Sequence, residues 1–260
     1  MDHLQTGKLW NDNAEAWTVM VRAGYDIYRD GLNTPAFMAM LPEIDGLTGL
    51  DIGCGEGHNT RLLARRGAAM TGLDIAGRFL LHARRAEMAE PLDIRFVQGS
   101  GLALPFPAGA FDFITAFMSL MDMPKTPRVL AEAHRVLKPG GFLQCSITHP
   151  CTDTPIRRKV KNKQGEDIAI ELGGYFRRVE GEVEEWSFGS APPEVRSRWP
   201  AFKVPRYTHT LANWLNMLID VGFTIERLNE PAPDDDVTKQ RPGLADAHIM
   251  PYFLHIRVRK

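Results

Sequence analysis

Three glycines at alternate positions follow a short apolar run, in the order Leu-Asp-Ile-Gly-Cys-Gly-Glu-Gly over residues 50–57. The apolar run predicts a strand, and Leu62-Leu63-Ala64 after the glycines has helical spacing. Glycine permits a positive φ and lets the backbone approach a ligand without a Cβ in the way. A glycine turn between a strand and a helix therefore predicts a pocket for a nucleotide-like ligand at the strand's carboxyl end.

Strand patterns alternate with helix patterns on both sides of this turn. Near-continuous apolar strands separated by amphipathic helices indicate a parallel sheet that is covered on both faces. The predicted fold class is therefore α/β, with a doubly wound Rossmann-like sheet. The aspartates at 234–236 are expected in a loop. The predicted strands are 48–52, 70–74, 94–98, 111–117, 142–148, 223–228 and 252–258, and the predicted helices are 59–66, 79–88, 126–137 and 211–221.

Residues 1–45, before the first strand, carry helical patterns and several aromatic side chains. Asn13 is expected to cap one helix, and Thr34-Pro35 has the composition of a second helix start. These helices either pack on the core or form a lid from which Tyr28 or Arg22 reaches the ligand.

Residues 150–207 interrupt the alternation with a basic run at 157–163 and an acidic run at 180–185. Short alternating pieces here suggest an antiparallel ribbon. An insertion at the carboxyl edge of a parallel sheet lies where ligands bind, so we expect a substrate cap. The expected organisation is a helical lid over 1–45, a ligand-binding core over 46–149, the cap over 150–207, and a completed core over 208–260.

The composition is that of an ordinary globular protein, with a net charge of -1 and a pI of about 6.7. Such a balance gives no overall basic field to attract nucleic acid or an anionic membrane. The first residues lack the apolar core of a signal peptide, and no apolar run reaches membrane-spanning length. Cys54, Cys145 and Cys151 form no disulfide pattern. We expect a soluble cytoplasmic protein without a membrane partner.

An acidic residue, Asp74, ends the second predicted strand about 20 residues after the glycines, where a carboxylate can accept hydrogen bonds from ribose hydroxyls. NAD enzymes share this feature, but here the spacing is G-x-G-x-G rather than G-x-G-x-x-G. Asp51, just before the glycines, would repel a pyrophosphate and tolerate a cationic ligand. No later motif suggests a nicotinamide site.

With these motifs the chain resembles the class I S-adenosylmethionine-dependent methyltransferases, in the small-molecule branch that includes the ubiquinone and menaquinone methyltransferases. The resemblance spans about residues 48–148 and implies a seven-stranded sheet whose last strand is antiparallel. It also implies S-adenosylmethionine as the cofactor and S-adenosylhomocysteine as its product. The matching segments are 50–57, 72–75, 102–106, 111–114 and 132–141.

The resemblance assigns cofactor contacts residue by residue. The glycine turn would pack against the methionine and ribose, Asn59 would lie near the amino-carboxylate end, and Asp74 would hold the ribose. Ile75 would lie against the adenine, and Ser100 stands where the family often has an aspartate beside that ring. Together with Tyr28 from the lid, the expected contacts are Asp51, Gly53, Cys54, Gly55, Gly57, Asn59, Asp74, Ile75, Ser100, Gly101, Leu102, Phe117 and Met118.

A base is needed only if the methyl acceptor must lose a proton, and a histidine is the usual choice. His149 follows the fifth core strand at the pocket edge, and is either this base or a turn residue before Pro150. His209 and Tyr207, where the insertion returns to the core, are further catalytic candidates, with helix capping or packing as the alternative.

Two other motifs are weaker. Pro150-Cys151 resembles the proline-cysteine pair of cytosine-5 methyltransferases but stands after the wrong strand, and His149 with Cys151 lacks further metal ligands. We expect no metal. The acidic run close behind the basic run argues against an extended phosphate track.

The predicted function is therefore methyl transfer to an O or N atom of a small organic metabolite. The alternatives are an RNA methyltransferase acting on tRNA or rRNA, and a non-catalytic cofactor-binding interaction module. The sequence says nothing about the oligomeric state.

Overall fold

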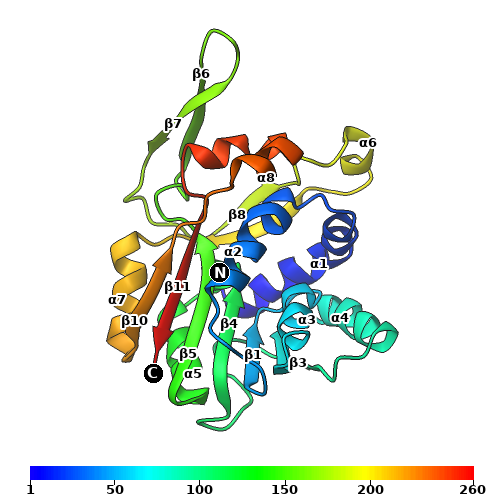
Figure 1. Ribbon diagram of the computed structural model, residues 1–260, viewed down its shortest axis with the longest axis vertical. Helices are drawn as coiled ribbons and strands as arrows, with labels where there is room; N and C mark the ends of the chain where they lie inside the picture. Colours follow the sequence, from blue (N-terminus) through cyan, green and yellow to red (C-terminus); the bar gives the residue numbers. More distant parts are fainter.

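The computed structural model describes residues 1–260, built around one seven-stranded sheet (Figure 1). The strand order is β10-β11-β5-β4-β1-β2-β3. Neighbours among β1 to β5 are parallel, whereas β11 is antiparallel to both β5 and β10. The predicted sheet, including its antiparallel last strand, is confirmed. The strands are β1 Thr48–Ile52, β2 Ala69–Asp74, β3 Arg95–Gln98, β4 Phe111–Phe117, β5 Leu137–Thr148, β10 Thr224–Asn229 and β11 Phe253–Arg259.

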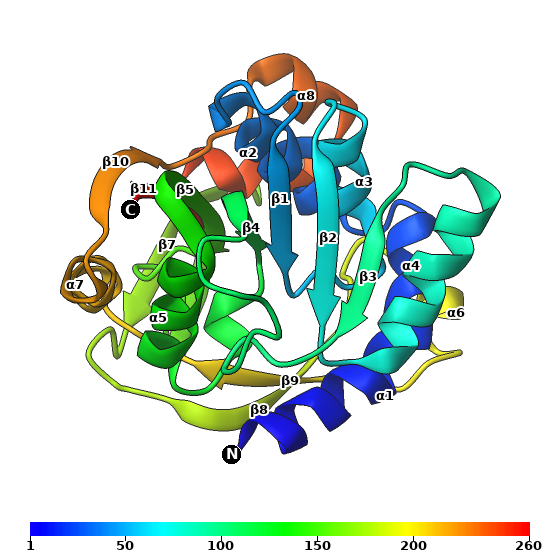
Figure 2. The same cartoon turned by 90° about the horizontal axis from the view of Figure 1, so that it is seen from below.

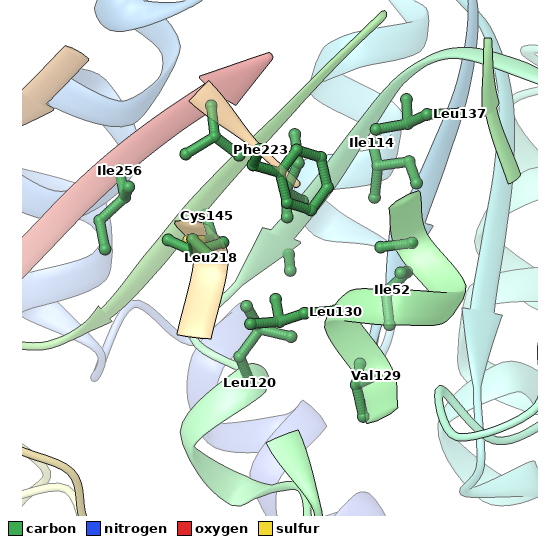
Figure 3. Packing of buried hydrophobic residues seen from close by; sticks show 14 of the residues in the cluster. Ile52, Ile114, Leu120, Val129, Leu130, Leu137, Cys145, Leu218, Phe223 and Ile256 are labelled. Atoms are coloured by element: carbon green, nitrogen blue, oxygen red, sulfur yellow. The ribbon is translucent and has the colours of Figure 1, made fainter. Parts of the chain in front are cut away.

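Helices cover both faces of this sheet. Leu130 of α5 (Thr126–Val136) and Leu218 of α7 (Leu211–Val221) pack with Ile52 and Ile114 of the strands in one buried cluster (Figure 3). The opposite face is covered by α2 (Thr34–Met40), α3 (His58–Ala64) and α4 (Gly77–Ala89). Apolar side chains on both faces of the strands explain why their sequences are nearly continuously hydrophobic.

The first helix, α1 (His3–Arg22), begins earlier than the sequence suggested. Its cap is Asp2, whose side chain accepts a hydrogen bond from the backbone N–H of Gln5, so the prediction of Asn13 as a cap is wrong. Asn13 is buried in mid-helix, and its amide exchanges two hydrogen bonds with the backbone of Lys203. A π-helical turn, η1 (Arg29–Asn33), runs directly into α2, where Pro35 occupies the first turn as expected.

The insertion consists of two antiparallel pairs, whereas its alternating pattern suggested one antiparallel ribbon or hairpin. The hairpin of β6 (Ile156–Lys161) and β7 (Asp167–Gly173) projects from the body of the protein (Figure 1). The second pair is β8 (Glu180–Trp186) and β9 (Phe202–Tyr207), with the short helix α6 (Pro193–Arg196) between them. Figure 2 shows that α1 and this second pair lie across the carboxyl ends of β1 and β2.

Most limits agree with the prediction to within about two residues, and three larger differences remain. The strand β5 begins at Leu137 and includes Pro139-Gly140-Gly141, because Leu137 already pairs with Phe111. The aspartates expected in a loop start a helix, since Asp234 caps α8 (Asp235–Gln240) by accepting from the N–H of Val237. The 3-10 helices η2 (Leu120–Asp122) and η3 (Pro242–His248) were not predicted. None of the helices combines the length and apolar character that crossing a membrane requires.

Candidate active site

The glycine turn has the conformation that its composition requires. Gly53, Gly55 and Gly57 have φ values of 75°, 54° and 87°, which side chains other than glycine rarely adopt. A Cβ at Gly53 would come within 2.4 Å of the Cβ of Ser119, so this position also excludes a side chain on steric grounds. No heavy atom lies within 4 Å of the Cβ position at Gly55. The turn therefore packs against the segment after β4 at Gly53 and leaves open space at Gly55.

Asp74 ends β2 beside this turn and is buried. Its Oδ2 accepts a hydrogen bond from the N–H of Gly55 at 2.8 Å, and its Oδ1 accepts one from Ala76 at 2.8 Å. Burial raises the pKa of Asp74 to about 6, with the two backbone N–H groups acting in the opposite direction. The carboxylate is thus fixed at the edge of the turn, and each oxygen retains a lone pair for a further donor.

The carboxyl of Asp51 lies beneath the turn and is also buried. The hydroxyls of Thr60 and Thr115 donate to it at 2.6 Å and 2.9 Å, which joins α3 to β4 under the glycines. Burial raises the pKa of Asp51, and burial also raises the pKa of the neighbouring Cys54 thiol well above its ordinary value. These contacts give Asp51 a supporting place in the turn and leave Cys54 without nucleophilic character.

The N-terminal segment, predicted to be a lid, contacts the turn and the residues next to it. Asn59, at the start of α3, accepts a hydrogen bond from the hydroxyl of Thr34 at 3.3 Å. Arg22, the last residue of α1, pairs with Glu56 inside the glycine turn at 3.0 Å. Gly7 packs directly on Ile75, because a Cβ there would meet the Ile75 side chain at 2.9 Å.

The expected adenine side opens into a cavity of about 480 Å³. Leu102, Tyr207 and His209 line it together, so the structure brings three of the predicted site residues to one place. The hydroxyl of Ser100 accepts from the N–H of Leu102 at 3.2 Å and so forms a local turn. Gly101 packs against α5 and the segment after η2.

His209 and Tyr207 have different hydrogen-bonding surroundings. The Nε2 of His209 lies 3.4 Å from the hydroxyl of Thr126, and burial lowers the pKa of its ring. The Tyr207 hydroxyl is buried and lies 3.1 Å from that of Thr6. Both remain catalytic predictions, and both face the cavity rather than the end of β4.

The end of β4 forms a second, more apolar side of the site. Phe117 meets the ring of Phe37 edge to face at 5.2 Å. Met118 has a positive φ of 51° and packs with Tyr28, Tyr252 and a small buried cluster. The structure thus places Tyr28 in the same cluster as Met118, at the expected methyl-transfer end.

A carboxylate organises the tyrosines on this side. Tyr28 and Tyr252 donate to the two oxygens of Asp246 at 2.6 Å and 2.8 Å, and Lys159 of the projecting hairpin pairs with the same carboxylate at 2.8 Å. Burial raises the pKa of Tyr252 to about 12 and raises that of Tyr28 as well. The segment after α1, the projecting hairpin and the residue before β11 therefore meet at Asp246.

His149 is buried and has both ring nitrogens engaged. Its Nε2 lies 2.7 Å from a carboxylate oxygen of Glu230, and its Nδ1 accepts from the N–H of Cys151 at 3.1 Å. The adjacent turn is closed by the hydroxyl of Thr152 donating to the His149 carbonyl. A catalytic role for His149 stays a prediction, and the arrangement matches the alternative of a turn residue. No group of three or more His, Cys, Asp or Glu side chains is arranged to hold a metal ion.

Comparison with known proteins supports the assignment of the glycine turn to an S-adenosylmethionine site. A family model described as a methyltransferase domain matches residues 50–145. A solved S-adenosylmethionine-dependent methyltransferase from Mesorhizobium loti superposes with a TM-score of 0.72 at 28% identity, covering 87% of this chain and 96% of that one. Residues 50–145 therefore form a class I S-adenosylmethionine-dependent methyltransferase domain.

Sequence relatives of this methyltransferase include enzymes named for small acceptors. A demethylmenaquinone methyltransferase from Tropheryma whipplei (strain Twist) is 43% identical over 103 residues, 39% of this chain and 42% of that protein. A trans-aconitate 2-methyltransferase from Deinococcus radiodurans is 30% identical over 157 residues, 59% of this chain and 58% of that protein. The chain thus spans only about half of these curated relatives.

S-adenosylmethionine is the cofactor of this family, and the residues of the methyltransferase fit it. The open position at Gly55 leaves room for a close approach, and the fixed carboxylate of Asp74 offers acceptors for two ribose hydroxyls. Ile75 and Leu102 supply apolar surface on the expected adenine side.

Sequence reasoning missed several residues that build the site. Ser119 donates to the carbonyl of Ile52 at 2.6 Å and touches Gly53, which locks the end of β4 to the turn. A polar residue two positions after an apolar strand was the available signal. Tyr252 and Asp246 gave no local signal, because their roles arise from contacts with a tyrosine more than 200 residues away.

Proposed function

We propose that this protein transfers a methyl group from S-adenosylmethionine to a nitrogen or oxygen atom of a small organic metabolite. The observation that carries the proposal is the buried Asp74 carboxylate, hydrogen-bonded to the glycine turn at Gly55. A carboxylate held there can accept hydrogen bonds from ribose hydroxyls. The acidic Asp51 beneath the turn suits a cationic ligand better than a pyrophosphate.

The residues of the site divide into two functions. The cofactor supplies an activated methyl group, and the protein contributes alignment and exclusion of water. Asp74, the glycine turn and Asn59 would hold the cofactor, with Ile75 and Leu102 along its ring. Phe117, Met118 and Tyr28 would border the methyl group, and α1 with β8 and β9 would close the site from solvent.

The surroundings of Met118 favour a partly apolar acceptor. Met118 packs with Tyr28 and Tyr252 against the cluster that contains Phe253, so an acceptor here would meet aromatic surface. Relatives named for demethylmenaquinone, trans-aconitate and malonyl-acyl carrier protein act on such small or carrier-bound molecules.

The basic run supports a small acceptor over RNA. Lys159 pairs with Asp167 and Asp246, and Lys161 also pairs with Asp167. Arg158 lies 3.5 Å from Glu171 across the hairpin. Cations already neutralised by carboxylates offer little to a phosphate backbone.

The test is a screen of metabolite pools for formation of S-adenosylhomocysteine, with methylated products identified by mass. Calorimetry on the purified protein should first show binding of S-adenosylmethionine. Tight cofactor binding without product from any pool would favour the non-catalytic module. Salt-sensitive binding and methylation of RNA would favour the RNA methyltransferase.

A further inference from the structure

Three polar side chains meet where α2 begins against the sheet. Asn33 ends the π-helical turn η1 directly before α2, and Ser146 and His255 belong to the neighbouring strands β5 and β11. Ser146 and His255 are paired across these strands, so their side chains lie on the same face of the sheet. All three residues are fully buried. Buried polar groups cost stability unless they are hydrogen-bonded, so the bonds within this cluster matter.

The side-chain oxygen of Asn33 is the common acceptor of the cluster. The hydroxyl of Ser146 donates to it at 2.9 Å, and the Nε2 of His255 lies 2.7 Å from it. Burial lowers the pKa of His255 to about 4, so this ring is neutral near pH 7. An amide oxygen only accepts, so Nε2 carries the ring proton and donates it to Asn33. One oxygen therefore fixes a side chain on each of two neighbouring strands.

Ser146 connects Asn33 to the end of β4. The backbone N–H of Met118 donates to the carbonyl of Ser146 at 2.8 Å, and the Ser146 hydroxyl lies 3.5 Å from the Met118 sulfur. Met118 has a positive φ of 51°, a conformation that persists in residues other than glycine only where the surroundings maintain it. Both the backbone and the side chain of Met118 are therefore held through Ser146.

A second connection runs along α2. Phe37 lies about one helical turn after Asn33, and its ring meets that of Phe117 edge to face with the centroids 5.2 Å apart. The start of α2 thus supports Phe117 and Met118, the two residues expected beside the transferred methyl group.

Stability alone explains the asparagine poorly. Its Nδ2 is buried without a hydrogen-bond partner among the protein groups. An unpaired buried donor is costly, and apolar side chains of similar shape across this interface would avoid that cost. The contacts made by the Asn33 oxygen therefore favour a role in the site.

We propose that Asn33 is a positioning residue for methyl transfer, which holds Met118 and Phe117 beside the methyl group of S-adenosylmethionine. The inference rests on the proposed function, because that function places both residues at the methyl-transfer end. Asn33 acts through Ser146 and through Phe37. Without the Asn33 oxygen, the Ser146 hydroxyl loses its acceptor and the support beneath Met118 rearranges.

Methyl transfer depends on support of this kind. An in-line displacement needs the sulfur, the methyl carbon and the acceptor atom close to one line. Side chains that border the methyl group limit the directions in which the sulfonium can point. A buried hydrogen-bond cluster beneath those side chains restricts their movement.

The test observes the methyl group directly and needs no methyl acceptor. S-adenosylmethionine labelled with ¹³C in its methyl group is added to the purified protein, and the bound methyl resonance is recorded by ¹H–¹³C NMR. Aromatic rings shift the signals of adjacent nuclei, so a displacement of Phe117 changes this resonance. Asn33→Ala and Ser146→Ala should each move it away from its position in the parent protein.

Calorimetry with S-adenosylhomocysteine separates loss of positioning from loss of the fold. Both variants should bind it like the parent. The matched control Asn216→Ala, at an exposed position of α7, should keep the parent's affinity and its methyl resonance.

An unchanged resonance in Asn33→Ala overturns the assignment of Asn33, and so does loss of the cofactor by both variants. If Asn33→Ala alone loses the cofactor, Ser146→Ala decides, because a moved resonance supports the assignment and an unchanged one overturns it. If the parent protein binds neither S-adenosylmethionine nor its product, the proposed function itself fails.

Discussion

Cofactor affinity should depend on pH through one carboxyl, Asp74. Its two oxygens are oriented by Gly55 and Ala76 beside the glycine turn, and only the ionised form can accept from two ribose hydroxyls. Burial sets the pKa of this carboxyl at about 6 in the free protein. S-adenosylhomocysteine affinity should therefore rise as the pH increases from 5.0 to 7.5.

The size of the effect follows from the fraction of ionised Asp74. With a pKa of about 6, roughly one molecule in eleven is ionised at pH 5.0 and nearly all are ionised at pH 7.5. If only the ionised form binds, the affinity changes about tenfold, or about 1.4 kcal/mol. Asp74→Ala should weaken binding by about 1–3 kcal/mol at pH 7.5, since a buried charged hydrogen bond is lost.

The free protein should show the opposite dependence. The folded pKa of Asp74 lies above its value in the unfolded chain, so the folded state holds more protons between about pH 4 and 6. This residue's contribution to stability is therefore greatest below pH 4 and falls as the pH rises through 6. Asp74→Asn removes the titration in both measurements.

Calorimetric titration with S-adenosylhomocysteine at five pH values is the direct assay. Asp74→Asn should give a flat profile, and Asp236→Asn should follow the parent. An equally steep profile in Asp74→Asn would refute the reasoning, because the titrating group would then lie elsewhere. A flat profile in the parent would also refute it.

Two other substitutions test the turn and the lid. Gly53→Ala should lower the free energy of unfolding in urea by at least about 2 kcal/mol, because a positive φ is combined with a clash against Ser119. The control is Gly46→Ala, at a φ of 72° with no neighbour within 4 Å, which should lower the free energy of unfolding by only about 1 kcal/mol. Trp17→Ala should cost about 3 kcal/mol and make β8 and β9 sensitive to limited proteolysis, since the ring packs on three aromatic rings of the insertion. Leu4→Ala, at a 67% exposed position, should change neither measurement, and equal proteolysis rates in the two variants would contradict the packing argument.

The sheet was predictable because its signals are local. The limits of β1, β4 and α7 agree with the sequence, since each has unbroken apolar periodicity and a clear stop such as Gly222. Alternation in the insertion suggested an antiparallel ribbon or hairpin, but not its two separate pairs or their limits. The prediction for Asn13 was wrong because an asparagine side chain can cap a helix or bind the backbone of a distant strand, as Asn13 does at Lys203.

The same difference between local and long-range signals applies to the residues of the site. The glycine turn and Asp74 follow from spacing along one short segment of chain. The contact of Gly7 with Ile75 joins segments far apart in sequence, so no local pattern predicts it. His149 shows the converse case, because its position after β5 suggested chemistry while Glu230, from a different loop, determines its environment.

The attachment of α1 has a consequence for the order of events at the site. The helix touches the cofactor side at Ile75 and Glu56, and it touches the insertion through Asn13 and Trp17. A movement of α1 that breaks its contacts with the cofactor side must also move or strain its contacts with the insertion. We therefore expect that release of the cofactor product through a movement of α1 would also expose the acceptor side to water.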